Sequence, residues 1–200
     1  MKTLEDERRI FQARFGYSGS LGAVGDFVGE QYQIYLLMSS PVIHEHENAR
    51  SACLQLLGDS YRQEGRFDDA MTILLELKSS NPKLGSFCGR NIDQQLKVQL
   101  LQVSYQFYQV GDRFEKSADS VHEAEAEAKQ ELLLAAKEAY HKAIQCAPED
   151  RATKTAWIRI NAKLDSNFTV FKISDGVFGI GNTSDGTATL DLDPAPDLGP

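Results

Sequence analysis

The residues with the most obvious capacity for chemistry are a short run of histidines and acids, His44-Glu45-His46-Glu47. A zinc site on one helix places its two histidines four residues apart, so that both rings face the ion. His44 and His46 are two residues apart and point away from each other on a helix. The run therefore predicts a solvent-exposed helix start. We expect no metal site and no cofactor.

Two further patterns lack the residues that their chemistry needs. Glu127 and Glu131 share a helix face, but a di-metal carboxylate site requires Glu-x-x-His on two helices. His122 and His141 do not complete such a set. The glycines of residues 16–25 lack the Lys-Ser/Thr of a phosphate-binding loop and predict a flexible connection between helices. No acid, base and nucleophile stand together, so the sequence predicts that the protein is not an enzyme.

Charge and cysteine content narrow the class of protein. The 200 residues carry a net charge of -8, and phosphate recognition needs a basic face, so we expect no nucleic-acid partner. No apolar run resembles a signal peptide or is long enough to span a bilayer, which predicts a cytoplasmic protein without membrane insertion. Cys53, Cys88 and Cys146 are odd in number and widely spaced, which favours free thiols.

Apolar spacing and break residues predict a chain of helices as far as Leu164. The expected helices cover about residues 3–14, 27–39, 45–64, 67–80, 93–110, 114–147 (as one helix, or as two with a kink near 117–120) and 151–164. Gly65 and Gly111 are expected to end helices, because glycine tolerates the left-handed conformation found there. Asp93 is the expected N-cap of the fifth helix, and residues 83–92 are expected to form a loop.

The composition changes after Ser166. Residues 168–173 alternate at a strand period, and residues 187–192 form a second candidate strand. The last ten residues, 191–200, are acidic and proline-rich, which is typical of a disordered tail. We expect a non-helical tail over residues 166–200, with a β-hairpin as one form of it.

An internal pattern gives the strongest indication of fold. The chain reads Leu54-x2-Leu57-Gly58-x2-Tyr61 and then Ala70-x3-Leu74-x2-Leu77-x4-Pro82. This pattern resembles the tetratricopeptide repeat (TPR) family, whose repeat is a helix-turn-helix of 34 residues. Small residues at Gly58 and Ala70 would let two antiparallel helices approach closely. Pro82 would prevent the second helix from continuing.

Parts of the pattern return later in the chain. The second-helix spacing returns in Ala136-x3-Tyr140-x2-Ala143-x4-Pro148. The first-helix spacing returns in Leu100-x2-Val103-Ser104-x2-Phe107. A further segment similar to a first helix is Trp157-x2-Ile160-Asn161-x2-Leu164. The resemblance implies an all-α, antiparallel helix-turn-helix superhelix over residues 1–165. Within it we expect the best repeat at 51–84, a degenerate repeat with a long insertion at 97–150, and a capping helix at 151–165.

The resemblance also implies a function, because stacked repeats leave a concave surface that usually binds a peptide or a partner helix. The family's groove positions fall on Ala52, Gln55, Asp59 and Arg62 in the first unit and on Val98, Leu101, Tyr105 and Tyr108 in the second. Family members that grip a terminal carboxylate carry Lys and Asn at two of these positions. Gln55 and Asp59 stand there instead, which argues against that subclass.

The expected helix 93–110 is apolar on two faces. One face is formed by Leu96, Leu100, Val103, Phe107 and Val110, and the other by the second-unit groove positions. A helix of this kind is buried on two sides, covered by a partner, or covered by residues 168–173 of the tail. The leading hypothesis is a scaffold, adaptor or chaperone-like assembly factor that binds a protein or peptide. The alternative is a structural subunit of a larger or homo-oligomeric complex.

Overall fold

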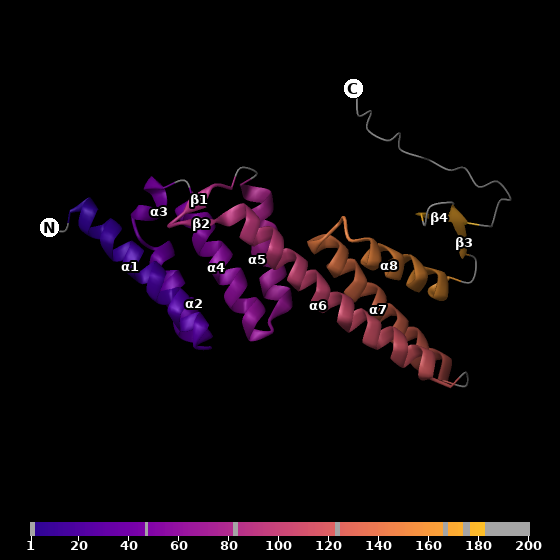
Figure 1. Cartoon of the computed structure of the whole chain (residues 1–200). Helices are drawn as coiled ribbons and strands as arrows, with labels where there is room; N and C mark the ends of the chain where they lie inside the picture. The colour runs from indigo at the N-terminus through magenta and orange to yellow at the C-terminus, as the bar shows by residue number, and fades with distance from the viewer. Residues whose placement is uncertain are drawn as a thin grey trace, which may run out of the picture. The chain divides into compact units, whose positions relative to one another are not determined.

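The computed structural model describes residues 3–46, 48–81, 84–122 and 125–165, and the backbone of 168–173 and 177–182. These ranges hold eight helices and two short strand pairs (Figure 1). The helices are α1 (Leu4–Ala23), α2 (Phe27–Met38), α3 (Val42–Glu45), α4 (Ala49–Glu64), α5 (Phe67–Ser80), α6 (Ile92–Ser120), α7 (Ala126–Cys146) and α8 (Arg151–Leu164). The predicted all-α fold class is confirmed.

The chain divides into two compact units. The first comprises the described residues up to Phe107 together with Gln145–Pro148, and the second comprises Tyr108–Ile144 and the described residues from Glu149 onward. The helix α6 contributes its first half to the first unit and its second half to the second. No described helix combines the length and apolarity needed to cross a membrane.

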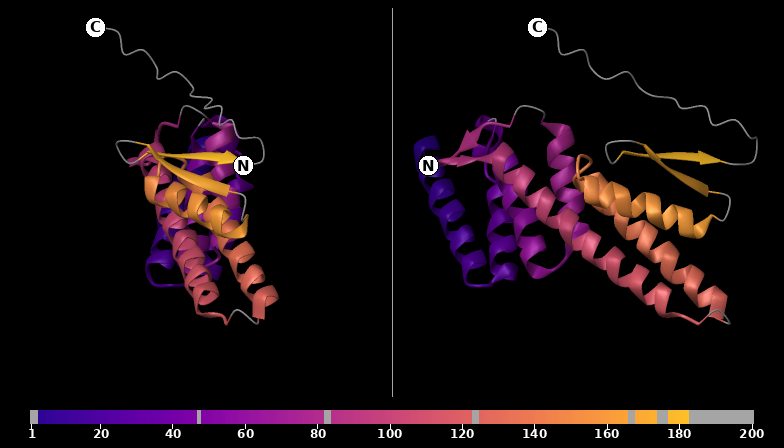
Figure 2. Two further views of the ribbon diagram at one scale, coloured as in Figure 1. Left: turned by 90° about the vertical axis from the view of Figure 1, so that its right-hand side faces the viewer. Right: turned by 45° about the vertical axis from the view of Figure 1, so that its right-hand side comes forward.

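The first unit is built on two antiparallel helix pairs, α1 with α2 and α4 with α5 (Figures 1 and 2). The turn between α4 and α5 is made by Gly65 in the left-handed conformation (φ 85°), as the sequence predicts. A Cβ on Gly58 would lie 2.6 Å from Cδ2 of Leu74. The absent side chain of Gly58 therefore sets how closely α4 and α5 pack, and buried Ala70 allows the same approach from α5.

A small β-hairpin follows α5, where the sequence analysis expects only a loop. The strands β1 (Ser86–Phe87) and β2 (Arg90–Asn91) pair antiparallel through a turn at Cys88 (φ 47°) and Gly89 (φ 77°). Phe87 anchors the hairpin, because its ring meets Phe15 edge-on at 5.4 Å between centroids. This anchor fixes the position of Arg90 on the opposite strand.

The second unit packs the end of α6 against α7 and α8. Its buried cluster consists of Ala118, Leu133, Ala136, Tyr140, Ala156 and Ile160. The side chain of Asp150 caps α8 by accepting from the backbone N–H of Thr153 at 3.1 Å. Beyond α8, β3 (Phe168–Ile173) and β4 (Val177–Asn182) pair antiparallel. The candidate strand at 187–192 lies outside the described residues.

Several predicted helix boundaries are wrong, and in α1 and α6 the reason is that packing overrides a local break residue. The helix α1 continues through the predicted glycine-rich connection to Ala23, and α6 continues through Gly111 to Ser120. The predicted helix 45–64 begins at Ala49, as α4. His44 and Glu45 end the short helix α3 instead of starting a helix. The predicted segment 114–147 takes its two-helix form, with α7 beginning at Ala126. Asn91, not Asp93, caps α6, since its side chain accepts from the N–H of Gln94.

The structure also changes the alignment of the degenerate repeat. A Cβ on Gly111 would lie 2.7 Å from the Tyr140 ring, just as one on Gly58 would meet Leu74. The segment Phe107-x2-Val110-Gly111-x2-Phe114 has the spacing of Leu54-x2-Leu57-Gly58-x2-Tyr61. Gly111, rather than Ser104, is therefore the counterpart of Gly58. The sequence analysis assigned Gly111 to a turn because glycine commonly ends helices.

Candidate binding pocket

The first unit contains a pocket of about 740 Å³. Three elements line it: α4, the turn and second strand of the β1–β2 hairpin, and the first half of α6. The lining residues are Gln55, Asp59, Arg62, Gly89, Arg90, Asn91, Gln94, Gln95, Val98, Gln99 and Gln102. Side-chain amides make up the largest share of this lining. The pocket is therefore mainly a hydrogen-bonding surface, with one apolar side chain, Val98, at its α6 wall.

Four of the predicted groove residues meet at this pocket. Gln55, Asp59 and Arg62 lie on α4, one or two helical turns apart, and Val98 faces them from α6. The α4 residues are those that the family resemblance assigns through the better of the two repeats. Val98 lines the pocket because α6 begins there, beside the hairpin. The revised alignment of Gly111 with Gly58 does not make Val98 a groove position.

Asp59 and Arg62 neutralise each other. Oδ1 of Asp59 accepts from Nε of Arg62 at 2.9 Å, and a second guanidinium nitrogen lies 2.8 Å from the same oxygen. The other oxygen, Oδ2, accepts from Nε2 of Gln63 at 3.0 Å. Both charged side chains are about three-quarters buried. Two guanidinium nitrogens of Arg62 thus share one oxygen of Asp59, and this close pairing offsets the charge of each side chain.

Two deeply buried glutamines present acceptors that nothing in the described chain satisfies. Gln55 is 2% exposed and Gln99 is 6% exposed. The side-chain oxygen Oε1 of each has no hydrogen-bond partner among the described residues. A buried polar atom without a partner costs about 1–3 kcal/mol. Such atoms are usually satisfied by water or by a ligand. Both glutamines line the pocket.

Arg90 supplies a positive charge that the sequence analysis did not assign. Its guanidinium lies over the Phe15 ring, 5.5 Å from the centroid. It makes no hydrogen bond and no ion pair with any described residue. A Cβ on Gly19 would lie 3.1 Å from one of its terminal nitrogens, so a larger residue in α1 would crowd it. The loop after Pro82 is long for the repeat, and that excess length was the one sequence signal for an added element here.

A buried carboxylate, Glu30, interacts electrostatically with two of the lining residues. Glu30 is 3% exposed, and its Oε2 has no hydrogen-bond partner among the described residues. Burial raises the pKa of this carboxyl; a hydrogen bond with Ser60 and the charge of Arg90 oppose the rise, and Asp59 adds to it. The side chain fits only because Gly22 has no Cβ, which would lie 2.5 Å from both carboxylate oxygens.

The second apolar face of α6 is open to solvent in the described structure. Val98, Leu101 and Tyr105 are 50%, 57% and 57% exposed. The interpretation of α6 as a helix buried on both faces is therefore wrong for this stretch. Leu101 and Tyr105 do not line the pocket; with Val98 they form an exposed apolar stripe along the helix. The side chains of 168–173, which the sequence analysis placed over Tyr105 as one option, lie outside the described residues.

Tyr108 does not join the pocket. It is partly buried against the core of the second unit, with its ring centroid 5.6 Å from that of Tyr140. The other face of α6 is the predicted core face: Leu96, Leu100, Val103 and Phe107 are buried. The sequence alone did not separate Tyr105 from Tyr108, because both fall on one helical stripe.

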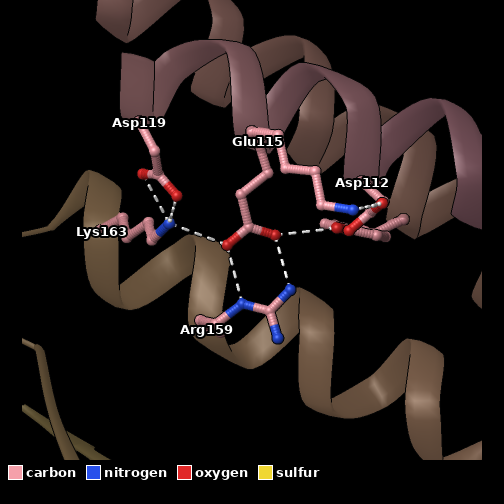
Figure 3. A network of polar contacts seen from close by, with 7 residues as sticks. Asp112, Glu115, Asp119, Arg159 and Lys163 are labelled. Atoms are coloured by element: carbon pink, nitrogen blue, oxygen red, sulfur yellow. Dashed lines mark hydrogen bonds and ion pairs between the residues drawn. The ribbon is translucent and has the colours of Figure 1, made fainter. Parts of the chain in front are cut away.

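The second unit holds a dense polar cluster around Glu115 (Figure 3). Arg159 donates from Nε at 2.7 Å and from a terminal nitrogen at 2.6 Å, one bond to each carboxylate oxygen. Tyr140 donates its hydroxyl at 2.8 Å, and Nζ of Lys163 lies 2.9 Å away while also contacting Asp119. Burial alone would raise the pKa of Glu115, but the bonds from Arg159, Lys163 and Tyr140 outweigh it and lower the pKa to about 2.

The ion pairs of this cluster link α6 to α8, and the cluster offers no reactive group. All four donors converge on one carboxylate, which stays ionised and has no remaining proton to exchange near neutral pH. Burial raises the pKa of the Cys53 and Cys146 thiols to about 12, so both stay protonated and unreactive. Among the described residues, no group of three or more His, Cys, Asp or Glu side chains is arranged to hold a metal ion.

Comparisons of the chain with protein-family models, with curated proteins and with solved structures returned no match.

Proposed function

We propose that the protein is a TPR-like interaction module that holds a segment of another protein in the pocket between α4, the β1–β2 hairpin and α6. The observation that carries the proposal is the meeting of Gln55, Asp59 and Arg62 at one pocket. The family resemblance assigns these residues to the groove from their positions in the repeat alone. A cytoplasmic adaptor or chaperone-like assembly factor is the form of this function that we favour.

The chemistry of the pocket suits a polypeptide. An extended peptide carries one N–H and one C=O at each residue, and a side-chain amide has both a donor and an acceptor to pair with them. The exposed side chains of Val98, Leu101 and Tyr105 would cover apolar side chains of the same segment. Alternation of main-chain bonds and side-chain pockets is a common mode of peptide recognition.

The test places one bulky charge in the pocket. Val98→Arg changes a half-exposed side chain and leaves the core intact, so we expect it to fold and to lose its partner. Val28→Arg makes the same substitution on α2, at a residue that is 74% exposed and does not line the pocket. Both variants and the wild type are used for capture from native lysate. Any captured protein is then purified and titrated against each variant.

Site-specific crosslinking decides whether the contact is at the pocket. A photoreactive residue at position 98 is expected to crosslink the purified partner, and one at position 28 is not. If Val98→Arg and Val28→Arg bind the partner equally, the pocket is not the binding site and the proposal falls. Circular dichroism melting of all variants separates lost binding from lost folding.

The exposed apolar stripe favours a second function, that of a structural subunit. Val98, Leu101 and Tyr105 would then be covered permanently by a neighbour, which includes a second copy of the chain. Sedimentation at micromolar concentration distinguishes the two. An oligomer that Tyr105→Arg converts to monomer supports the structural subunit, and a monomeric wild type supports the adaptor.

A further inference from the structure

The guanidinium of Arg90 is a charged group of the pocket whose donors have no partner among the described residues. An arginine has five N–H donors in a planar fork that matches a carboxylate. Two guanidinium nitrogens of Arg62 already contact Asp59. The side chain of Arg90 makes no hydrogen bond or ion pair within the described residues, and one face of its guanidinium lies over the ring of Phe15. The group is thus oriented in advance, with its donors unpaired.

Glu30 does not serve as the partner of Arg90. The two groups interact electrostatically, but they form no ion pair. Glu30 is buried, and its raised pKa shows that its surroundings disfavour the charged form. The carboxylate of a ligand would pair with Arg90 at the surface of the pocket. Such a pair does not require a carboxylate to be buried in the protein interior.

The acceptors of the same pocket set a second requirement. The oxygens of Gln55 and Gln99 need N–H or O–H donors, and a free carboxylate has none to offer. A ligand that satisfies both sets must carry an acid group and amide N–H groups together. An acidic residue within an extended polypeptide does so, since its backbone N–H groups flank its side-chain carboxylate.

We propose that the pocket selects a segment with an Asp or Glu side chain, whose carboxylate pairs with Arg90 while its main-chain N–H groups donate to Gln55 and Gln99. This inference rests on the proposed function and specifies its ligand. The positive charge comes from the hairpin that lengthens the loop after Pro82. The specificity is therefore built on an element added to the helix pairs.

The probe is a phage-displayed library of random 12-residue peptides. It is selected on the wild type after removal of phage that bind Val98→Arg. We expect one acidic position to emerge in the enriched peptides. A synthetic copy, acetylated and amidated so that it has no terminal charges, is then titrated by fluorescence anisotropy beside a copy with Gln at that position.

A double-mutant cycle tests the pairing itself. Arg90→Gln and the acid-to-Gln peptide change should each weaken binding about tenfold, the range expected for a hydrogen-bonded charge pair, and together hardly more than either alone. Arg90→Lys keeps the charge but loses the fork, so its loss should be smaller. Arg50→Gln, an exposed arginine of α4 outside the pocket, should leave the affinity unchanged.

The outcomes separate this inference from the function on which it rests. If peptides are enriched that depend on Val98 but tolerate Arg90→Gln, the pocket binds peptide and the acidic specificity is overturned. If no enriched peptide distinguishes the wild type from Val98→Arg, the proposed function is overturned and this inference with it. Equal melting temperatures of Arg90→Gln and the wild type exclude a folding defect as the cause of lost binding.

Discussion

Glu30 and Glu115 are both nearly inaccessible to solvent, and their surroundings act on them in opposite directions. Glu115 accepts from Arg159, Tyr140 and Lys163, so its charged form is favoured and its pKa is lowered to about 2. Glu30 has one oxygen without a partner, and burial raises its pKa. Burial alone therefore does not predict the ionisation of a carboxyl; the number of donors around it does.

Glu30→Gln is expected to stabilise the protein at neutral pH. A raised pKa means that the folded protein binds the proton more tightly than the unfolded chain, so the stability that the proton confers is lost as pH rises above about 4.5, through the folded-state pKa. The neutral amide removes this loss, and we expect about 1 kcal/mol in its favour at pH 7. Urea unfolding at pH 4 and pH 7 measures the effect.

The control for this experiment is Glu76→Gln, an exposed glutamate on α5. Its stability should stay within about 0.5 kcal/mol of the wild type at both pH values. A Glu30→Gln variant that is less stable than the wild type at pH 7 would show that the charged carboxylate is held by a favourable contact.

At the scale of the helix, glycine has two different roles in this chain. Gly22, Gly58 and Gly111 lie where another side chain occupies the space of a Cβ. Gly16 lies in α1, and beyond the adjacent backbone of its own helix nothing comes within 4 Å of that space. The glycine run of residues 16–25 predicts a connection between helices, because glycine lowers helix stability by about 1 kcal/mol relative to alanine. Packing between α1 and α2 outweighs that cost.

Gly16→Ala and Gly111→Ala are expected to change stability in opposite directions. The first should stabilise the protein by about 0.5–1 kcal/mol, because alanine favours the helix and nothing obstructs its methyl group. The second should destabilise it by about 1–3 kcal/mol, because the methyl group would overlap the buried ring of Tyr140. Thermal denaturation of both variants provides the comparison. Destabilisation by Gly16→Ala would contradict the open surroundings of that residue.

Two tyrosines one turn apart on α6 belong to different surroundings. Tyr105→Ala removes a side chain that is 57% exposed, and stability should change by less than about 0.5 kcal/mol. Tyr108→Ala removes a ring packed against Tyr140 and should cost about 1–3 kcal/mol. Chemical unfolding of the two single variants measures this difference. Equal losses would mean that Tyr105 is covered in solution by a part of the chain or by a second copy.

At the scale of the whole molecule, acid should act on the second unit through Glu115. Its lowered pKa means that the ionised form contributes stability fully above about pH 4.5, and that this contribution is lost as pH falls toward 2. Glu115→Gln should therefore cost about 2–4 kcal/mol near neutral pH, and the difference from the wild type should shrink below pH 4. Urea unfolding of both proteins from pH 2.5 to pH 7 provides the measurement.

Amide hydrogen exchange assigns the effect to a unit. In Glu115→Gln near neutral pH, faster exchange is expected in the second half of α6, in α7 and in α8. Exchange in α4 and α5, which belong to the first unit, should follow the wild type. A pH-independent difference in stability would mean that Glu115 acts through packing and not through its charge.

Local signals in the sequence are enough to predict the helical fold and most of the helix boundaries. The boundaries of α5 and α8 match the predicted residues 67–80 and 151–164, because strong local signals agree there: Gly65 before α5, Pro148 and Asp150 before α8. The core face of α6 also follows from spacing alone, since a helix brings residues three and four apart onto one side. Gln55, Asp59 and Arg62 were placed through the best repeat, whose close contact at Gly58 the structure reproduces.

The rest of the pocket depends on contacts between distant parts of the chain. The hairpin that carries Arg90 has strands of two residues, too short for any periodicity to reveal, and it forms because Phe87 packs against Phe11 and Phe15 from a distant helix. The continuation of α6 through Gly111 likewise depends on Tyr140 of another helix. Contacts between residues far apart in the chain leave no local pattern. For that reason the sequence predicts the pocket residues on α4 and does not predict those on the hairpin.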